Sequence, residues 1–351
     1  MEPVRIGVIG CGVIGQHHLK AAKASPLVSL LAVADVRPEA LERAAREFSV
    51  PRAYSSGEAL LDDREVEAVV LALPTCWRTP LALKAFSAGK HVLTEKPVAM
   101  NADEVEQMIL AKGSLVGACC SSRYRFLESS DAAERFVATG ALGEIHAVRC
   151  HAIAPAGPPP KSTPPAWRLS RALNGGGIMM NWGCYDLDFL LGILGWKLQP
   201  RRALARCWPI AEQFASHVAS GSDAESHVAA FVECEGGAAI LYERAEYAVC
   251  RPEGTWQISG SRGTLHLKMS VSSDKVIARD SYDPASGVTP HILWQGSEDW
   301  AAVHNGPVLD FASAIRKNRL PKTSLEHALV VQKVTDAIYA SAERGHAVEI
   351  P

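Results

Sequence analysis

The first residues able to do chemistry form the string Gly10-Cys11-Gly12-Val13-Ile14-Gly15 near the start of the chain. Its GxGxxG spacing is weak evidence alone, but here it follows an apolar run and opens an amphipathic one. In such a strand–turn–helix unit, the first glycine permits a tight turn, the second lets the backbone approach a pyrophosphate, and the third lets helix and strand pack closely. The pyrophosphate then sits on free N–H groups at the start of the helix, and we expect Val13 and Ile14 of this turn to contact the cofactor.

An acidic residue supports this interpretation. Asp35 follows the second predicted strand, about 20 residues after Gly15. Its carboxylate can accept hydrogen bonds from the adenosine ribose, and it would repel a 2′-phosphate, so it favours NAD over NADP. Arg37 softens that preference, so NADP stays possible. The alternative is an ordinary strand–turn–helix with incidental glycines. We also expect the nucleotide to contact Leu73 and Pro74 at the end of the third predicted strand.

A candidate catalytic lysine stands in Glu95-Lys96-Pro97, directly after the fourth predicted strand. Ligands of parallel sheets bind beyond the carboxyl ends of the strands. An ammonium there can bond a substrate hydroxyl or carbonyl and stabilise alkoxide character during hydride transfer. Alternatively, Lys96 is a surface lysine at a turn, paired with Glu95. Arg123 follows the fifth predicted strand, and we expect it and Glu95 to line the cofactor site.

The elements that position these residues alternate in the first third of the chain. Strands are predicted at 4–9, 28–34, 68–73, 91–94 and 115–120, and helices at 15–24, 38–48, 80–88 and 102–111. Near-continuous apolar strands alternating with helices are typical of a parallel sheet covered on both faces. The sequence therefore predicts an α/β protein with an N-terminal Rossmann doubly wound domain over residues 1–122.

The pattern changes beyond residue 122. Strands are predicted at 145–153, 227–233, 238–246, 255–259 and 263–268, and helices at 175–194 and 325–343, with a proline-rich loop over 155–165. His304 and Asn305 are expected just before a further helix. Few crossover helices separate these strands, so residues 123–351 are predicted to form an α+β substrate domain with a large open mixed sheet. We expect the last helix to pack back near the Rossmann domain.

Composition excludes several classes of protein. The length of 351 residues favours two domains, and 48% hydrophobic with 21% charged residues is ordinary for a globular protein. A net charge of −2 without long charged blocks predicts neither nucleic-acid nor membrane partners. Nine cysteines without a CxxC pair fit reduced thiols in a cytoplasmic protein, and no histidine spacing suggests a metal. We find no secretory signal and no apolar run of about 18 residues.

The combination of GCGVIG, TEKP at 94–97 and a GGG segment at 175–177 resembles the glucose–fructose oxidoreductase / inositol dehydrogenase / MocA family along essentially the whole chain. The resemblance implies an NAD(P)-dependent enzyme acting on the CH–OH groups of sugars or cyclitols. It makes Lys96 the catalytic lysine and implies a cis Lys96–Pro97 peptide. It also implies a C-terminal domain whose open sheet forms an oligomer interface, hence a homodimer or homotetramer.

The stretch from Trp167 to Gly177 is most similar to the sugar dehydrogenase branch, which carries a WRL…ALxGGG run. By that resemblance, Trp167 and Arg168 approach the cofactor. Arg168 is able to bind the pyrophosphate, and Trp167 to cover the nicotinamide. The alternative for Trp167 is a place in the core.

The family pattern continues as GGG-xxx-D-x-G-x-H-xx-D, and this chain departs from it twice. Asn181 stands at the Asp position and Tyr185 at the His position. An amide cannot take a proton but can orient a hydroxyl, so Asn181 and the adjacent Trp182 are predicted substrate contacts. Tyr185 would then act as the acid–base residue. Its ordinary pKa is about 10, and a nearby Lys96 ammonium would lower that pKa. Alternatively, Asn181 is a buried spacer and Tyr185 a packing residue.

Three functions remain open. The first is a sugar or cyclitol dehydrogenase that uses Lys96 and Tyr185. The second is a glycoside-modifying enzyme whose tightly held NAD is recycled, for which the Asn181 departure leaves room. The third is an NAD-sensing regulator without catalysis, because fold alone does not fix function. The sugar, the reaction direction and the exchange or recycling of the cofactor are not readable from the sequence.

Overall fold

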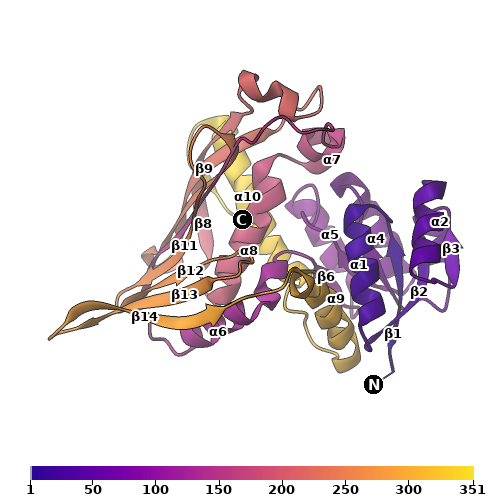
Figure 1. The fold of residues 1–351 in the computed structure, drawn as a ribbon, viewed down its shortest axis with the longest axis horizontal. Helices are drawn as coiled ribbons and strands as arrows, with labels where there is room; N and C mark the ends of the chain where they lie inside the picture. The colour runs from indigo at the N-terminus through magenta and orange to yellow at the C-terminus, as the bar shows by residue number, and fades with distance from the viewer. Residues whose placement is uncertain (1) are drawn as a thin grey trace. The chain divides into compact units, whose positions relative to one another are not determined.

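The computed structural model describes residues 2–351. It contains two compact units, each built on one sheet (Figure 1). The first unit runs to Arg123 and also includes Trp300–Leu329, whereas the second comprises Tyr124–Asp299 and Val330–Pro351. The predicted domain boundary after residue 122 stays a prediction; the compact units differ from it in grouping residues 300–329 with the first.

The first unit has a six-stranded parallel sheet. Its strands are β1 (Val4–Ile9), β2 (Val28–Ala34), β3 (Arg52–Tyr54), β4 (Ala68–Leu71), β5 (His91–Thr94) and β6 (Gly117–Cys119). Their order, β3-β2-β1-β4-β5-β6, is that of a Rossmann fold and reverses between β1 and β4. The predicted doubly wound sheet is confirmed, and its ligand edge lies at the carboxyl ends of β1 and β4.

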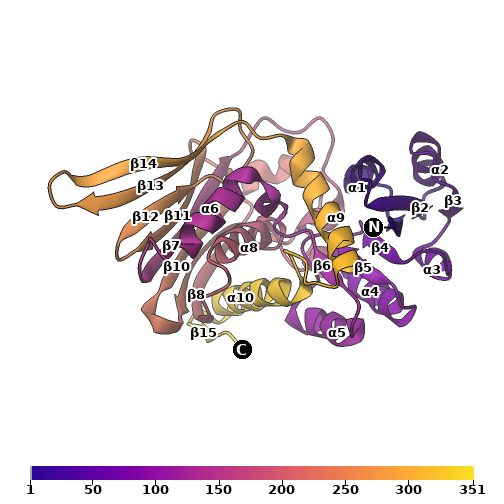
Figure 2. The same ribbon diagram turned by 90° about the horizontal axis from the view of Figure 1, so that it is seen from below.

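Helices cover both faces of this sheet (Figure 2). One face carries α1 (Val13–Ala24), α2 (Pro38–Glu47) and α9 (Trp300–Lys317), and the other carries α3 (Gly57–Leu61), α4 (Arg78–Ser87) and α5 (Ala102–Lys112). Val308 and Phe311 of α9 are fully buried in one core cluster with Leu19 of α1. This burial is why residues 300–329 belong to the first unit. His304 was expected before a helix but lies inside α9.

The second unit has a nine-stranded sheet. Its strands are β7 (Ile145–Pro155), β8 (Pro200–Pro209), β9 (Glu225–Cys234), β10 (Ala239–Ala248), β11 (Glu253–Gly260), β12 (Gly263–Leu267), β13 (Lys275–Asp283), β14 (Gly287–Gly296) and β15 (Val348–Glu349). The order is β14-β13-β12-β11-β7-β10-β9-β8-β15. Only β7 and β10 pair in parallel among these described strands. The predicted open mixed sheet is confirmed.

Helices α6 (Glu128–Ala138) and α8 (Cys184–Ile193) and the later part of α10 (Leu325–Arg344) lie on one face of this sheet (Figures 1 and 2). Every residue of α8 is buried. The helix predicted over 175–194 is not continuous, because Met179–Gly183 forms a π-helical turn before α8 begins. Such turns are rare and often occur at functional sites. No helix in the described residues 2–351 is long and apolar enough to cross a membrane.

Candidate active site

The glycine turn between β1 and α1 has two glycines that the chain itself requires. Gly10 has φ +99°, and a Cβ there would collide with the Ala72 carbonyl oxygen; a Cβ on Gly15 would collide with the Gly10 carbonyl oxygen. Gly12 differs, because a Cβ there would lie no closer than 3.6 Å to Arg37 Nη2. The protein alone does not need glycine at position 12. A pyrophosphate approaching the backbone supplies the reason, so the turn fits a dinucleotide.

The N-terminus of α1 is equally suited to an anion. The N-cap, Gly12, has no side chain to cap the helix, and the first turn contains no acidic residue. Val13 opens the helix 85% exposed. The N–H groups of a first helical turn have no partner within the helix and carry the positive end of its dipole. This turn can therefore bind phosphate oxygens directly.

Asp35 closes the same turn from β2. Its Oδ2 accepts a hydrogen bond from the Cys11 N–H at 2.7 Å, and its Oδ1 accepts from the Arg37 N–H at 2.9 Å. The Arg37 guanidinium, 62% exposed, folds over the carboxylate with Nε 3.2 Å from Oδ1. Burial raises the pKa of Asp35, but the hydrogen bonds from Arg37 and Cys11 outweigh it and lower the pKa overall. Asp35 is thus held as a carboxylate, the form that accepts from a ribose.

Leu73 and Pro74 follow β4 at the carboxyl edge of the sheet, and both are half-buried. They lie in sequence next to Ala72, against which Gly10 packs. The structure thus brings the predicted turn, Asp35 and this segment to the same edge of the first sheet.

Lys96 begins the segment after β5, and its main chain is clamped on both sides. The Lys96–Pro97 peptide is cis, as the resemblance implied. The buried Arg78 guanidinium of α4 donates through Nη1 to the carbonyls of Glu95 and Pro97, and its Nε donates to the Leu73 carbonyl at 2.7 Å. Lys96 is half-buried. The carbonyls on both sides of Lys96 are therefore held by one guanidinium at the carboxyl end of β5.

Glu95 is the centre of a buried ionic network. Arg123 Nη2 contacts both of its carboxylate oxygens, at 2.7 and 2.8 Å, and His18 Nε2 lies 2.7 Å from Oε1. The Lys96 N–H donates to Oε2 at 2.9 Å. Burial raises the pKa of the Glu95 carboxyl, but the charge of Arg123 and the His18 hydrogen bond hold it well below its ordinary value. An ionised Glu95 thus anchors the peptide of the candidate catalytic lysine.

Two further histidines extend this network. Arg123 Nη1 donates to Nδ1 of His304 at 2.9 Å, and the His304 ring stacks on His17 with centroids 4.0 Å apart. Burial lowers the pKa of His304 to about 4, with Arg123 adding to the effect, so this ring accepts as a neutral imidazole. The direct cofactor contacts predicted for Glu95 and Arg123 stay predictions, since the structure shows these two residues binding each other.

One buried group in the described residues has metal-ligand composition, namely His18, Glu95 and Cys120. Arg123 already engages both oxygens of Glu95. A divalent cation there would lie beside a fixed guanidinium charge. Burial also raises the pKa of the Cys120 thiol well above its ordinary value, which disfavours the thiolate that a metal requires. This cluster is suited to holding Lys96 rather than an ion.

The second unit contributes the predicted substrate residues from the π-helical turn and α8. Asn181 and Trp182 are half-buried, whereas Tyr185 is 5% exposed. The Tyr185 ring makes edge contacts with Tyr124, at 5.3 Å between centroids, and with Trp182, at 5.6 Å. The structure therefore brings Trp182 and Tyr185 together, in an aromatic cluster that limits how the Tyr185 ring can turn.

Trp167 and Arg168 lie in the short helical turn Ala166–Leu169 after the proline-rich loop. Trp167 is 36% exposed, so a core position does not fit. Arg168 Nη2 bonds Oε2 of Glu246 at 2.8 Å. Arg168 as a pyrophosphate ligand stays a prediction, and in this structure its guanidinium is paired with a carboxylate of β10.

Sequence reasoning missed a polar row on β10. Tyr242, Arg244 and Glu246 alternate along this strand, so they belong to the face that carries the buried Ile240. The Arg244 guanidinium lies 4.5 Å from the Trp182 ring centroid and 3.4 Å from Asp186. Polar residues at the inward positions of a strand were the available signal. It becomes readable only once the sheet shows which face is inward.

Asp186 binds this row from α8. Its carboxylate accepts from Trp256 Nε1 at 2.9 Å and from the Tyr242 hydroxyl at 3.2 Å. Burial raises the pKa of Asp186, and Arg244 with the neutral donors offsets only part of that rise. Asp186 is fully buried beneath the turn that carries Asn181 and Trp182. Its hydrogen bonds fix α8 to the sheet.

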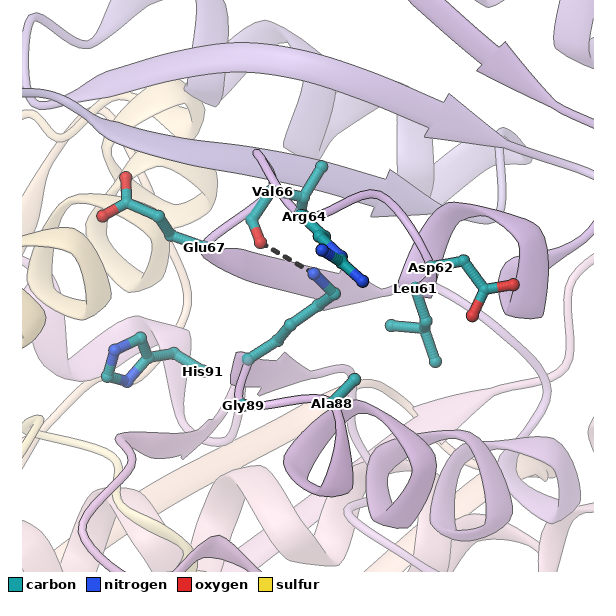
Figure 3. A pocket seen from close by; sticks show the side chains of 9 residues that line it. Leu61, Asp62, Arg64, Val66, Glu67, Ala88, Gly89 and His91 are labelled. Atoms are coloured by element: carbon teal, nitrogen blue, oxygen red, sulfur yellow. Dashed lines mark hydrogen bonds between the residues drawn. The ribbon is translucent and has the colours of Figure 1, made fainter.

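A polar depression of about 540 Å³ lies elsewhere in the first unit, lined by residues 61–67 and 88–91 (Figure 3). The Lys90 ammonium is buried beside it and donates to the carbonyls of Asp63 and Val66, at 2.7 and 2.8 Å. His91 and Ala68 mark the amino ends of β5 and β4. Ligands of such sheets bind at the opposite edge, so this depression is not part of the nucleotide site.

These features define a dinucleotide-binding oxidoreductase scaffold, and comparison with known proteins agrees. The chain matches the GFO_IDH_MocA oxidoreductase family in two parts: the NAD-binding Rossmann fold over residues 4–114 and the C-terminal alpha/beta domain over residues 135–350. The chain therefore belongs to this family, and it is an NAD-binding oxidoreductase. The family predicted from GCGVIG, TEKP and GGG is confirmed.

Similar proteins with assigned activities carry sugar names. The chain is 24% identical to the levoglucosan dehydrogenase of Pseudarthrobacter phenanthrenivorans, covering 100% of this chain and 99% of that protein. It is 31% identical to the dTDP-3,4-didehydro-2,6-dideoxy-alpha-D-glucose 3-reductase of Streptomyces violaceoruber, over 78% of this chain and 75% of that protein. A solved levoglucosan dehydrogenase in complex with NADH superposes with a TM-score of 0.87 at 22% identity, covering 100% of both chains. This last likeness concerns the fold.

Proposed function

We propose that this chain transfers a hydride between a nicotinamide and a hydroxyl-bearing carbon of a sugar, sugar derivative or cyclitol. The observation that carries the proposal is the clamped Lys96 peptide at the carboxyl end of β5, beside the glycine turn of the same sheet. The sugar substrates named for the relatives support the substrate class.

Each unit has its own duty in this proposal. Bound NAD supplies the hydride acceptor. Lys96 donates a hydrogen bond to the reacting oxygen and stabilises its developing negative charge. Tyr185 takes the hydroxyl proton during oxidation and returns it during reduction. Asn181 orients a neighbouring hydroxyl, and Trp182 offers a ring to the substrate.

The cofactor contacts follow the turn geometry. Val13 and Ile14 in the first turn of α1 would hold the pyrophosphate, and Asp35 would accept from the adenosine ribose. Arg37 already pairs with Asp35, so it would have to turn away to meet a 2′-phosphate. NAD is therefore preferred to NADP. Leu73 and Pro74 line the same edge. Trp167 covers the nicotinamide in this proposal, and Arg168 would reach the pyrophosphate only by leaving Glu246.

Assembly and location extend the proposal. Leu204, Trp208 and Phe231 are 49%, 45% and 44% exposed on the face of the second sheet that lies opposite α8. An apolar group of this kind on one face is typical of an interface. We assign it to a second copy of this chain, as a homodimer or homotetramer. The nine cysteines carry thiols rather than disulfides in residues 2–351, which suits the cytoplasm.

The test is the absorbance at 340 nm of purified protein with NAD or NADP and a panel of levoglucosan, D-glucose, D-xylose and myo-inositol. We expect NAD-dependent turnover with at least one member. Lys96→Ala and Tyr185→Phe should each lower kcat by about 100- to 10,000-fold, the usual contribution of a positioned acid–base group. Lys84→Ala, which removes an exposed lysine of α4, is the matched control and should stay within about twofold.

The other two functions give different results. A recycled cofactor predicts NAD that remains bound through gel filtration, with glycoside cleavage and no net change at 340 nm. A sensor predicts NAD binding without turnover and no effect of Lys96→Ala. No turnover with any member of the panel, in a protein that binds NAD, would reject the dehydrogenase proposal.

A further inference from the structure

The carboxyl end of β10 is irregular at one place. Ala245 pairs with Ile153 of β7 and Ala248 pairs with Pro155, so β10 has one more residue than its partner between these pairs. Tyr247 there has φ +59°, a conformation uncommon for a non-glycine residue. Bulges of this kind redirect a side chain and occur often beside active sites. The redirected position carries Glu246.

Only one of the two oxygens of the Glu246 carboxyl has a hydrogen-bond partner in the described residues. Oε2 accepts from Arg168 Nη2 at 2.8 Å, whereas Oε1 is buried without a hydrogen-bond partner in the described residues. Buried polar atoms are nearly always bonded, so an orphaned carboxylate oxygen indicates a missing donor. Burial raises the pKa of Glu246, and the charge of Arg168 offsets part of the rise. A hydroxyl is a donor that suits either protonation state of this carboxyl.

A purely structural role explains only part of this arrangement. The Arg168–Glu246 pair ties the segment after the proline-rich loop to the sheet, and one carboxylate oxygen is enough for that. The role of the second oxygen remains to be explained. Neither the bulge nor the left-handed Tyr247 is needed to hold a surface loop. A bulge and a left-handed residue beside one buried polar side chain are typical of a ligand site.

The neighbours of Glu246 have the chemistry of a sugar-binding site. Arg168 and Arg244 bring guanidinium donors. Arg244 precedes Glu246 by two residues on the same face of β10, and its guanidinium lies over the Trp182 ring. A carboxylate that accepts, guanidinium groups that donate and an aromatic ring together match a neutral polyhydroxylated ring. All four side chains belong to the second unit, which carries the predicted substrate residues.

We propose that Glu246 is a substrate-binding residue whose Oε1 accepts a hydrogen bond from one ring hydroxyl, with Arg168 holding the carboxyl in place. This rests on the proposed sugar or cyclitol substrate and adds a determinant of specificity. Glu246 selects substrates that carry a hydroxyl at one ring position. It discriminates against the analogue that lacks this hydroxyl, because the analogue leaves the buried oxygen unbonded.

The test compares Glu246→Gln with Glu243→Gln, a control on the same strand. Glu243 lies among exposed histidines on the other face of β10. We expect Glu246→Gln to raise KM for the best substrate of the panel by about 10- to 100-fold, the loss of a hydrogen bond to a charged group. The KM for NAD should stay within about twofold. Glu243→Gln should leave both constants within about twofold.

Single-deoxy analogues of that substrate locate the hydroxyl. Wild-type protein should discriminate against one analogue by about tenfold or more, and Glu246→Gln should lose this discrimination while retaining any other. If Glu246→Gln does not fold, Glu246→Asp keeps the charge for Arg168, withdraws the carboxyl by one methylene and should show the same loss. Thermal shifts with the same sugars report binding without turnover.

The outcomes separate the two proposals. Sugar binding that is lost in Glu246→Gln, in a protein that turns over no substrate, upholds the subsite and rejects the dehydrogenase. Turnover with an unchanged sugar KM in Glu246→Gln rejects the subsite alone. The subsite proposal is also rejected if Glu246→Gln raises only the KM for NAD or lowers only the melting temperature. It is rejected as well if the wild-type protein neither binds nor converts any sugar of the panel.

Discussion

Each unit contains a fully buried carboxylate, and the pKa values of these two carboxylates are shifted in opposite directions. Glu95 in the first unit and Asp186 in the second are 2% and 0% exposed. The pKa of Glu95 is held well below its ordinary value, whereas that of Asp186 is raised. Burial raises the pKa of both carboxyls, so burial alone cannot explain the difference.

The partners explain it. Glu95 has a guanidinium nitrogen on both oxygens, at 2.7 and 2.8 Å, together with His18 and a backbone N–H. Asp186 has its guanidinium at 3.4 Å and takes its two closer bonds from neutral donors. Close charged donors stabilise the ionised form more than neutral donors do. The kind of donor and its distance therefore decide whether a buried carboxyl is ionised.

The largest expected effect is on the first site. Glu95→Gln removes the counter-charge of Arg123, so that a buried guanidinium loses its carboxylate partner. Breaking a buried ion pair in this way costs about 3–5 kcal/mol of unfolding free energy. Urea denaturation measures it. A loss below about 1 kcal/mol would show that Arg123 finds another partner, and the contrast between the two sites would then fail.

A smaller effect is expected at the second site. Asp186→Asn keeps one oxygen that can accept from Trp256, and its amide nitrogen can donate to the Tyr242 hydroxyl. Arg244 keeps its contact with the Trp182 ring. We expect a loss of about 1–2 kcal/mol, less than at Glu95, because the lost ion pair had already been weakened by distance. Denaturation of both variants in one buffer provides the check. Equal losses would remove the distinction.

The contributions of Glu95 and Asp186 to the unfolding free energy should depend on pH in opposite ways. The pKa of folded Glu95 is below its ordinary 4.5, so its contribution is present above that pH and is lost only as pH falls through the folded pKa. The pKa of folded Asp186 is above its ordinary 3.8, so its contribution is complete below that pH and is lost as pH rises through the folded pKa. As the pH falls toward 3.8, the stability gap between wild type and Asp186→Asn should widen, while the gap to Glu95→Gln stays level down to about pH 4.5. Parallel slopes would contradict this assignment.

Arg78→Lys tests the clamp that distinguishes the first site. A lysine has one nitrogen and cannot reach the carbonyls on both sides of Lys96 as the planar guanidinium does. We expect kcat to fall about tenfold, because the segment that carries Lys96 is displaced. The KM for NAD should be unchanged, because the glycine turn that binds the nucleotide is intact. Arg64→Lys, at an exposed arginine, is the control. An unchanged kcat with a lower melting temperature would give Arg78 a structural role only.

The smallest effect is expected for an exposed carboxylate. Glu243 is 37% exposed and lies near His151 and His227. Glu243→Gln should change the unfolding free energy by less than about 0.5 kcal/mol, because solvent screens such pairs. A change near that of Glu95→Gln would mean that the second copy assigned to this face also covers Glu243.

Local patterns predicted much of the first unit. The glycine spacing, Asp35 and the apolar strands are all short-range signals, and the structure has β1, β2 and β5 at the predicted residues. The short strand β3 was missed because three residues carry no periodicity. In the second unit, β8, β13 and β14 were missed, since strands with many polar residues have little hydrophobic alternation. The two-residue strand β15 was missed for the same reason as β3.

The sequence by itself determined the chemistry that is available: a glycine turn, an acidic residue after the second strand, a lysine before a proline, and the family to which they belong. Only the tertiary structure decided how those groups are held. It brought Arg78, Arg123 and His18 to Glu95 across long sequence separations, and it turned Arg244 and Glu246 inward on β10. Neither could be predicted, because strand register, a bulge and the packing of distant helices depend on long-range contacts that no local pattern encodes.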